Sequence, residues 1–223
     1  MTAFPTESST KYPRTHHLPW SDTIGPDGDH VLRDVSVFKD QEIVVTEKLD
    51  GENTTLYRSH LHARSLDSRH HPSRDWVKNL HARLAPHIPS GIRISGESCF
   101  AKHSIRYEGL PSYFFIFAVW EGETCLSWDD TASFVSQLNA ASGEEVPLVP
   151  LLYRGLWNEK QVRSLQTGVS QVGGAQEGYV VRLAGSFTLA DWHRSIAKYV
   201  RPNHVQTGQH WMLAPIERNG LAS

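Results

Sequence analysis

Hydrophobic and polar positions alternate along this chain in short runs, and these predict more strands than helices. Runs rich in β-branched and aromatic residues predict six strands: Glu42–Thr46, Asn53–Ser59, Ile92–Gly96, Tyr113–Trp120, Gly178–Leu183 and Ile196–Arg201. Apolar residues at helical spacing predict two helices and a weaker third: Ser73–Leu84, Asp129–Asn139 and Asn158–Leu165. Ser73 and Asp129 are the expected N-caps, because such side chains accept hydrogen bonds from the first helical amides.

The predicted strands do not alternate regularly with helices, as they would in a parallel sheet. Their order therefore predicts an α+β fold with antiparallel sheets flanked by helices. We expect a single domain over residues 1–223, in which residues 1–30 form an N-terminal arm and loop. The first ten residues are expected to be mobile, and the Gly- and Pro-rich stretch Ser21–Asp29 is expected to be a surface loop.

Composition narrows the class of protein. A chain of 223 residues suffices for one sizeable core, and 39% hydrophobic and 21% charged residues are ordinary for a globular protein. No apolar run approaches the roughly 18 residues of a membrane span, and the N-terminus lacks the apolar stretch of a secretory signal. Cys99 and Cys125 lack metal-binding spacing and argue against a disulfide framework. We expect a cytoplasmic monomer with no membrane partner.

Charge is distributed unevenly, although the net charge is only −2. The stretch from Glu121 to Tyr153 has six acids and no Lys or Arg. Between Asn53 and Arg106 only three acids accompany nine basic residues: Arg58, Arg64, Arg69, Arg74, Lys78, Arg83, Arg93, Lys102 and Arg106. Such segregation suggests one face that meets phosphates and another that does not. For any single run of like charge, solvation of a surface helix is the better explanation.

The segment with the clearest chemistry is residues 47–53, Glu-Lys-Leu-Asp-Gly-Glu-Asn, which lies between two predicted strands. A lysine at a strand end before a glycine turn is held by rigid backbone, so its amine projects into a cleft. The ammonium group becomes a nucleophile where neighbouring cations or desolvation lower its pKa. A Lys-x-Asp-Gly tetrapeptide alone is equally typical of a β-turn, so Lys48 needs support from the rest of the chain.

Four further segments follow in a fixed order: Glu97 at a strand end, the aromatic strand Tyr113–Trp120, Glu177 at the start of a strand, and Lys198 with Arg201 on the last strand. With the segment around Lys48, this order resembles motifs I, III, IIIa, IV and V of the covalent nucleotidyltransferase superfamily. That superfamily contains DNA ligases, RNA ligases and mRNA capping enzymes. The resemblance spans Glu42 to Arg201, which is most of the chain.

Within the superfamily, the chain is most similar to ATP-dependent RNA ligases of the RNA ligase 2-like group. DNA ligases and capping enzymes usually carry Arg two residues after the motif I glycine, where this chain has Asn53. The pair Gly96-Glu97, followed by Ala-Lys-His-Ser-Ile at residues 101–105, also looks like that group.

The resemblance implies the ligase-type adenylation fold and a three-step reaction. Lys48 would attack the α-phosphate of ATP to form a lysyl–AMP phosphoramidate. AMP would then pass to an RNA 5′-phosphate, and an RNA 3′-hydroxyl would displace it to seal the strand. Lys198 would contact the α-phosphate, with Arg201 a second candidate, and Asp50 would orient Lys48 or its turn. Because each step moves charge on phosphate, catalysis would consist mostly of positioning and charge neutralisation.

The same resemblance implies metal and ribose contacts. Arg64 would bind ribose or phosphate. Glu97 would bind the ribose hydroxyls or a metal-bound water, and Glu177 would hold Mg²⁺ (or Mn²⁺) through water, since Mg²⁺ keeps much of its hydration. Glu97 and Glu177 are therefore the expected metal-binding pair.

Three further groups complete the expected site. Phe115 or Phe117 would stack on adenine, because alternate residues of a strand point to one face. Glu47 and Asn53 are the remaining expected ATP-binding residues. Residues 11–17, Lys-Tyr-Pro-Arg-Thr-His-His, mix basic, polar and aromatic types that suit a core poorly. We expect this segment to line the pyrophosphate or RNA end of the cleft, although a docked N-terminal arm would have a similar composition.

The match weakens at the end of the chain. Only 22 residues follow Arg201, so we expect no OB-fold of the kind that many ligases use to grip nucleic acid. Either the basic stretch between Asn53 and Arg106 grips RNA in a minimal ligase, or a partner protein completes the site. A DNA end-joining or capping enzyme is a second interpretation, disfavoured by Asn53 and the missing OB-fold. A non-catalytic relic is a third, disfavoured because Lys48 and the downstream charged residues are present.

Overall fold

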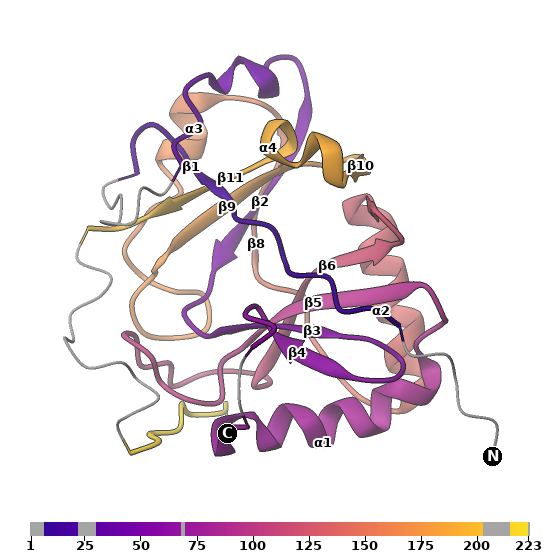
Figure 1. The fold of residues 1–223 in the computed structure, drawn as a ribbon. Helices are drawn as coiled ribbons and strands as arrows, with labels where there is room; N and C mark the ends of the chain where they lie inside the picture. Colours follow the sequence, from indigo (N-terminus) through magenta and orange to yellow (C-terminus); the bar gives the residue numbers. More distant parts are fainter. Residues whose placement is uncertain (1–6, 22–29, 68–69, 203–214, 223) are drawn as a thin grey trace.

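A computed structural model describes residues 7–21, 30–67, 70–202 and 215–222. They form two β-sheets that face each other, with helices on their outer sides (Figure 1). The first sheet has the order β1 (His16–His17), β11 (Ile196–Val200), β9 (Gly178–Leu183), β2 (Glu42–Lys48) and β8 (Leu151–Leu156). The second has the order β10 (Phe187–Thr188), β7 (Thr124–Cys125), β6 (Phe114–Glu121), β5 (Ile92–Ser98), β3 (Glu52–Leu56) and β4 (Leu61–Ala63).

Strand pairing within both sheets is antiparallel, except that β1 runs parallel to β11. The predicted α+β class with antiparallel sheets is therefore confirmed. The two segments expected to be mobile or to form a surface loop lie mainly in residues 1–6 and 22–29, outside the described residues.

The helices are short and few. The α-helices are α1 (Asp75–Leu84), α2 (Trp128–Ser142), α3 (Glu159–Arg163) and α4 (Trp192–Ser195). The 3₁₀ helices are η1 (Val35–Phe38), η2 (Pro72–Arg74), η3 (Ala85–His87) and η4 (Leu189–Asp191). Among the described helices, none has the length and apolar character that crossing a membrane requires.

Hydrophobic packing covers the outer face of each sheet and leaves the two inner faces available for a site. In β2 the odd-numbered residues Ile43 and Val45 pack outward in one core cluster with Val162 of α3. On the second sheet, α1 and α2 cover the outer face through a cluster that includes Leu80, Val135 and other apolar residues of both helices. The remaining faces of the two sheets are thus turned toward each other.

All six predicted strands are present, and the differences have local causes. The predicted strand Asn53–Ser59 ends at Leu56, because the Tyr57 amide bonds to the His60 carbonyl and turns the chain into β4. The strands that the sequence did not indicate are β1, β4, β7, β8 and β10. Four of these have only two or three residues, too few to show a period.

Both expected N-caps are wrong by one or two residues. Ser73 lies inside η2, whose cap is His71, and the His71 ring accepts a hydrogen bond from the Ser73 amide. Helix α2 begins at Trp128, and its cap is Ser127, whose Oγ accepts from the Asp130 amide at 3.0 Å. The third predicted helix begins after Asn158 as expected but ends at Arg163, two residues early.

Most cations of the basic stretch between Asn53 and Arg106 are buried or lie in ion pairs, and whether this stretch grips RNA stays a prediction. Arg93 is buried with its guanidinium 4.5 Å from the centre of the Trp120 ring, and Arg69 lies outside the described residues. Five other cations lie in ion pairs: Arg74 with Glu52, Lys78 with Asp75, Arg83 with Glu144, Lys102 with Glu217, and Arg106 with Glu108.

Candidate active site between the two sheets

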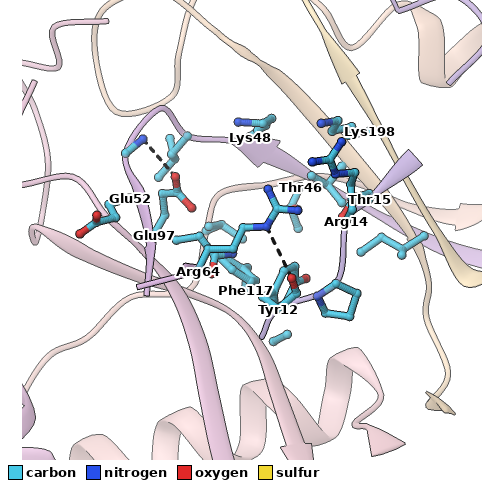
Figure 2. A pocket seen from close by; sticks show the side chains of 18 of the residues that line it. Tyr12, Arg14, Thr15, Thr46, Lys48, Glu52, Arg64, Glu97, Phe117 and Lys198 are labelled. Carbon is cyan, nitrogen blue, oxygen red and sulfur yellow. Dashed lines mark hydrogen bonds between the residues drawn. The ribbon is translucent and has the colours of Figure 1, made fainter. Parts of the chain in front are cut away.

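A cavity of about 610 Å³ lies between the sheets, within the size range of small-molecule sites. Residues of the first sheet, Thr46, Lys48 and Lys198 among them, form one wall (Figure 2). Glu97, Phe117 and Arg64 belong to the second sheet and the residues next to it, and they form the opposite wall. The N-terminal segment Tyr12–Thr15 closes the side between the two walls.

Lys48 is the last residue of β2, a strand with paired neighbours on both sides. Its register partner on β9 is Gly178. A Cβ on Gly178 would lie 2.0 Å from the Tyr199 carbonyl oxygen, so only glycine lets the strands approach this closely. Gly51, in the turn after Lys48, is similarly constrained, because its Cβ would lie 2.5 Å from the Ser98 carbonyl oxygen. Both glycines therefore fix the backbone that presents Lys48.

Lys48 donates a hydrogen bond to Glu177 Oε2 across 2.6 Å. Loss of hydration alone would lower the pKa of Lys48, but the carboxylates of Glu177, Glu97 and Asp50 outweigh that effect and raise it above its ordinary value. The expectation of a lowered pKa is therefore wrong for the protein without ligand. Lys48 is held as an ammonium ion, and a bound ligand must change its surroundings before it can act as a nucleophile.

Two carboxylates close to Lys48 are held in a partly neutral state. Loss of hydration raises the pKa of Glu97 to about 8, although Lys48 opposes the shift. Burial likewise raises the pKa of Glu177 to about 7 against the pull of Lys48. Glu97 Oε1 also accepts a hydrogen bond from the Gly51 amide at 3.1 Å, which ties β5 to the turn after Lys48. Three carboxyl groups thus lie around one ammonium group, and a cation bound beside them would favour their ionised forms.

The hydrogen bonds of Asp50 hold the turn, in addition to the effect of its charge on Lys48. Its Oδ2 accepts three hydrogen bonds of 2.7 Å, from the Ser104 amide, the Ser104 hydroxyl and the Ile105 amide. The Asp50 amide in turn donates to the Tyr107 hydroxyl at 2.8 Å. Of the two roles expected for Asp50, these contacts match the one in which it orients the turn.

Cations gather on the side of the cavity away from Glu97. Lys198 on β11 and Thr46 on β2 share the register partner Val180 on β9, so the three lie in one row across the sheet. Arg14 lines the cavity near Lys198 in Figure 2, and Arg64 lines it from the opposite wall. Arg201 does not line the cavity. Its backbone amide donates to the Glu177 carbonyl at 2.9 Å.

Aromatic side chains form one end of the cavity. Phe115 is fully buried in the core, whereas Phe117 lines the cavity, so Phe117 is the ring of the two that a ligand reaches. Tyr12 packs edge-on against Phe117 at 5.2 Å between ring centroids and against Trp192 at 5.1 Å. The Trp192 indole donates to the Arg14 carbonyl at 3.1 Å, which holds the arm at this place.

Two polar atoms at the cavity are buried without a hydrogen-bond partner among the described residues: Asn53 Oδ1 and Glu47 Oε1. The other Glu47 oxygen accepts from the Gln171 amide at 3.0 Å. Burial raises the pKa of Glu47 above its ordinary value. Unsatisfied buried acceptors are rare and call for a donor, which a ligand in the cavity can supply.

The sequence model of the RNA ligase family matches residues 41–200. The chain belongs to the RNA ligase family. The match begins just before β2 and ends with β11, so it includes Lys48, Glu97, Glu177 and Lys198. No curated protein sequence matches the chain.

Solved structures of Naegleria gruberi RNA ligase have a similar fold. A lysine-to-alanine mutant with ATP and manganese has a TM-score of 0.56 and 21% identity, and the alignment covers 75% of this chain and 52% of that chain. An aspartate-to-alanine mutant without ligand has a TM-score of 0.61 and 20% identity, with 89% and 57% covered. The mixed α+β fold with two sheets therefore matches the adenylation domain of an RNA ligase. The chain spans less than two thirds of the length of these structures.

Against this family fold, the expected site residues fall into two groups. Seven of them line the cavity: Glu47, Lys48, Asn53, Arg64, Glu97, Phe117 and Lys198. The other three do not line it. Glu177 accepts a hydrogen bond from Lys48, Asp50 accepts one from the Ser104 amide, and the Arg201 amide donates one to the Glu177 carbonyl. The expectation that the segment from Lys11 to His17 lines the cleft fits its middle part, Tyr12–Thr15.

Sequence reasoning missed several cavity residues of this RNA ligase family member. Glu52 and Arg74 form a two-pronged ion pair, with Arg74 Nε 2.6 Å from Glu52 Oε2. Arg182 is buried and lines the cavity while donating to the Leu126 carbonyl at 2.6 Å. His103 lines the cavity from the loop after β5. Glu52 and His103 lie in segments that the sequence singled out, residues 47–53 and 101–105, and Arg74 was counted in the basic stretch, but no role was predicted for any of them.

Proposed function

We propose that this protein is an ATP-dependent RNA ligase that acts through a lysyl–AMP intermediate on Lys48. The observation that supports this most is the single strand-end lysine paired with Glu177 at the edge of a cavity with cations on one side and an aromatic end. Family membership and the cavity's size agree with a nucleotide as ligand.

The first step makes one P–N bond and breaks one P–O bond. The Lys48 nitrogen bonds to the α-phosphorus of ATP, and pyrophosphate leaves with the electrons of the broken bond. The nitrogen gives up two protons, one to Glu177, whose pKa near 7 makes it a competent acceptor, and one to the departing pyrophosphate. The phosphate groups of ATP add negative charge next to the carboxylates around Lys48, and Lys198 is the cation at the cavity that would balance the charge on the phosphates.

The remaining contacts follow from the geometry of the cavity. Phe117 and Tyr12 would hold the adenine ring, and Glu97 with Arg64 would face the ribose. Arg14 would meet the β- and γ-phosphates, since it is exposed at the cation side of the cavity. The unpaired acceptors of Glu47 and other cavity residues would take hydrogen bonds from amino or hydroxyl groups of the nucleotide.

Magnesium or manganese fits the charge of the site. No group of three His, Cys, Asp or Glu side chains in the described ranges is arranged to hold a metal ion. Glu97 and Glu177 are two carboxyl groups beside Lys48 whose pKa values are raised by burial, and a divalent cation bound next to them would favour their ionised forms. Such a pair would hold Mg²⁺ through its water molecules together with substrate phosphates. The ion would supply charge neutralisation on the triphosphate, while the protein residues position it.

The later steps would pass AMP to an RNA 5′-phosphate and seal it to a 3′-hydroxyl. Asn53 at the cavity and the family match favour RNA over DNA. The chain spans only part of the length of the Naegleria ligases, so sealing is proposed either for this chain alone or for the chain with a partner protein.

Labelling with radioactive nucleotide tests the proposal. The protein is incubated with ATP or GTP labelled at the α-phosphate and Mg²⁺, then run on a denaturing gel. We expect label from ATP on the wild type and on Lys160→Ala, an exposed control, but not on Lys48→Ala. A wild type that takes no label overturns the proposal, and label from GTP alone assigns a capping reaction instead. Adding 5′-phosphorylated RNA or DNA strands then identifies the acceptor.

A further inference from the structure

Residues 215–222 pack against the irregular loop that follows β5. Ala101 and Leu110 of this loop form isolated bridges with Arg218 and Leu221. The segment appears in yellow beside the magenta loop in Figure 1. No reaction step proposed above uses this segment, and none of its residues lines the cavity.

Asn219 is the centre of this contact. Its side chain is only 3% exposed, and both of its polar atoms are used. Oδ1 accepts from the Tyr107 amide at 2.9 Å, and Nδ2 donates to the Cys99 carbonyl at 2.8 Å. Its backbone amide donates to the Phe100 carbonyl, and its carbonyl accepts from the Tyr113 hydroxyl at 3.1 Å. The buried side-chain amide thus joins the start of the loop to its middle, and the backbone carbonyl of Asn219 reaches the end of the loop.

The same loop holds the turn that follows Lys48. The hydroxyl of Tyr107 accepts from the Asp50 amide, and the Ser104 and Ile105 amides donate to the Asp50 carboxylate. Tyr107 is therefore bonded through its backbone to Asn219 and through its ring to the turn. Two hydrogen bonds therefore connect Asn219 to Asp50: one joins Asn219 to Tyr107, and the other joins Tyr107 to Asp50. Asp50 lies two residues after Lys48.

We propose that Asn219 is a positioning residue for adenylylation of Lys48, acting through Tyr107 and Asp50. This inference rests on the proposed function. The loop lacks regular strand pairing of its own, so its shape depends on the side-chain bonds that Asn219 supplies. A misplacement of about 1 Å at a reacting group costs on the order of 100-fold in rate, which gives such a remote residue leverage over Lys48.

Single-turnover formation of lysyl–AMP in the intact chain tests the proposal, because the rate constant is independent of the folded fraction that sets the amplitude. Asn219→Ala should lower the rate constant at saturating ATP by roughly 10- to 100-fold. The ATP concentration at half-maximal rate should change by less than about threefold, because most residues that line the cavity, such as Thr46, Phe117 and Lys198, lie outside this loop and the turn. Glu217→Gln is the matched control, since that exposed side chain reaches only Lys102 and Arg106.

Tyr107→Phe provides a second route, because it removes only the hydroxyl that receives the Asp50 amide. It should slow the same step, and the double variant should be little slower than Asn219→Ala alone. Wild-type rate constants in Tyr107→Phe and in any folded Asn219→Ala would overturn the inference.

Amide exchange at residues 49–51 without ATP is an independent readout. It should be faster in Asn219→Ala than in the wild type, and unchanged exchange contradicts positioning. If the wild type takes no label while Asn219→Ala still exchanges faster than the wild type, the proposed function fails and the structural link from Asn219 to the turn stands.

Discussion

At the residue scale, the charge state of Lys48 is set by carboxylates that lie far from it in the sequence. The strand-end position and the glycine turn are local, so they can be recognised from seven consecutive residues. The pKa of Lys48 depends on Glu97 and Glu177, which arrive from strands far along the chain. Sequence reasoning emphasised cations such as Lys198, whereas the fold brings the carboxylates closer. Which side chains converge on a group is a tertiary property, and no local pattern encodes it.

The raised pKa of Lys48 predicts how lysyl–AMP formation depends on pH. Below its pKa, the neutral amine fraction rises tenfold for each unit of pH, and Glu177 also becomes able to accept a proton as pH passes its pKa of about 7. The single-turnover rate should therefore rise between pH 6 and pH 9. Rate constants measured at one-unit steps check this. A flat profile with full labelling would mean that Lys48 is already neutral in the ATP complex.

Glu97 predicts a pH-dependent gain in stability on substitution. Its pKa of about 8 in the fold exceeds the ordinary 4.5, so the folded state binds more protons and ionisation of Glu97 destabilises it as pH rises from 4.5 to 8. Glu97→Gln keeps the acceptor for the Gly51 amide but cannot ionise. Its Tm should exceed that of the wild type by roughly 2–4 °C at pH 8.5, the effect of about 1 kcal/mol in a domain this large. The gain should vanish at pH 5, whereas exposed Glu145→Gln should show no such trend.

At the element scale, strands with a clear run of β-branched and aromatic residues were predictable, and short or edge strands were not. Strand β8 is an edge strand whose Leu151 and Leu156 are exposed, so it lacks the alternation that marks a half-buried strand. Its Gly155 weakened the pattern further. The N-caps failed for a different reason: Ser127 and His71 compete with nearby serine and aspartate residues that have similar capping ability, and only the final geometry decides among them.

Two ion pairs that join elements should differ strongly in their effect on stability. Arg74 and Glu52, with side chains 8% and 15% exposed, link η2 to β3 beside the cavity. Arg74→Ala leaves the Glu52 carboxylate buried without its cation, which should cost about 3–5 kcal/mol of unfolding free energy. Arg83, 51% exposed in its pair with Glu144, should cost roughly 0–1 kcal/mol when changed to Ala. Urea unfolding of both variants measures the difference, and equal losses would contradict the assigned burial.

At the scale of the whole molecule, the N-terminal arm spans both sheets. Thr10 donates to the Tyr57 hydroxyl beside the second sheet, and β1 pairs with β11 in the first sheet. Between these anchors, Tyr12 and Arg14 face the cavity. Composition suggested that this segment was not core, yet its path across the cavity depends on Trp192, which lies about 180 residues away in sequence. Because no local pattern encodes such long-range contacts, the sequence could predict that this segment lies near the cleft but not which of its residues line the cavity.

Ion pairing across the whole molecule predicts where RNA does not bind. Exchanging the partners in two pairs, Arg83→Glu with Glu144→Arg and Lys102→Glu with Glu217→Lys, keeps the net charge and both exchanged ion pairs, and it removes the 3.9 Å contact between Arg106 and Glu217. If these cations are already neutralised, the affinity for 5′-phosphorylated RNA should stay within about twofold and its salt dependence should not change. Each lost phosphate contact would instead reduce the slope of log K against log salt by about 0.7 for a single strand. Titration of labelled RNA at several salt concentrations measures both quantities. A slope lower by 1 or more would place RNA on this stretch, and an unchanged slope leaves the cavity mouth around Arg14 as the surface to test next.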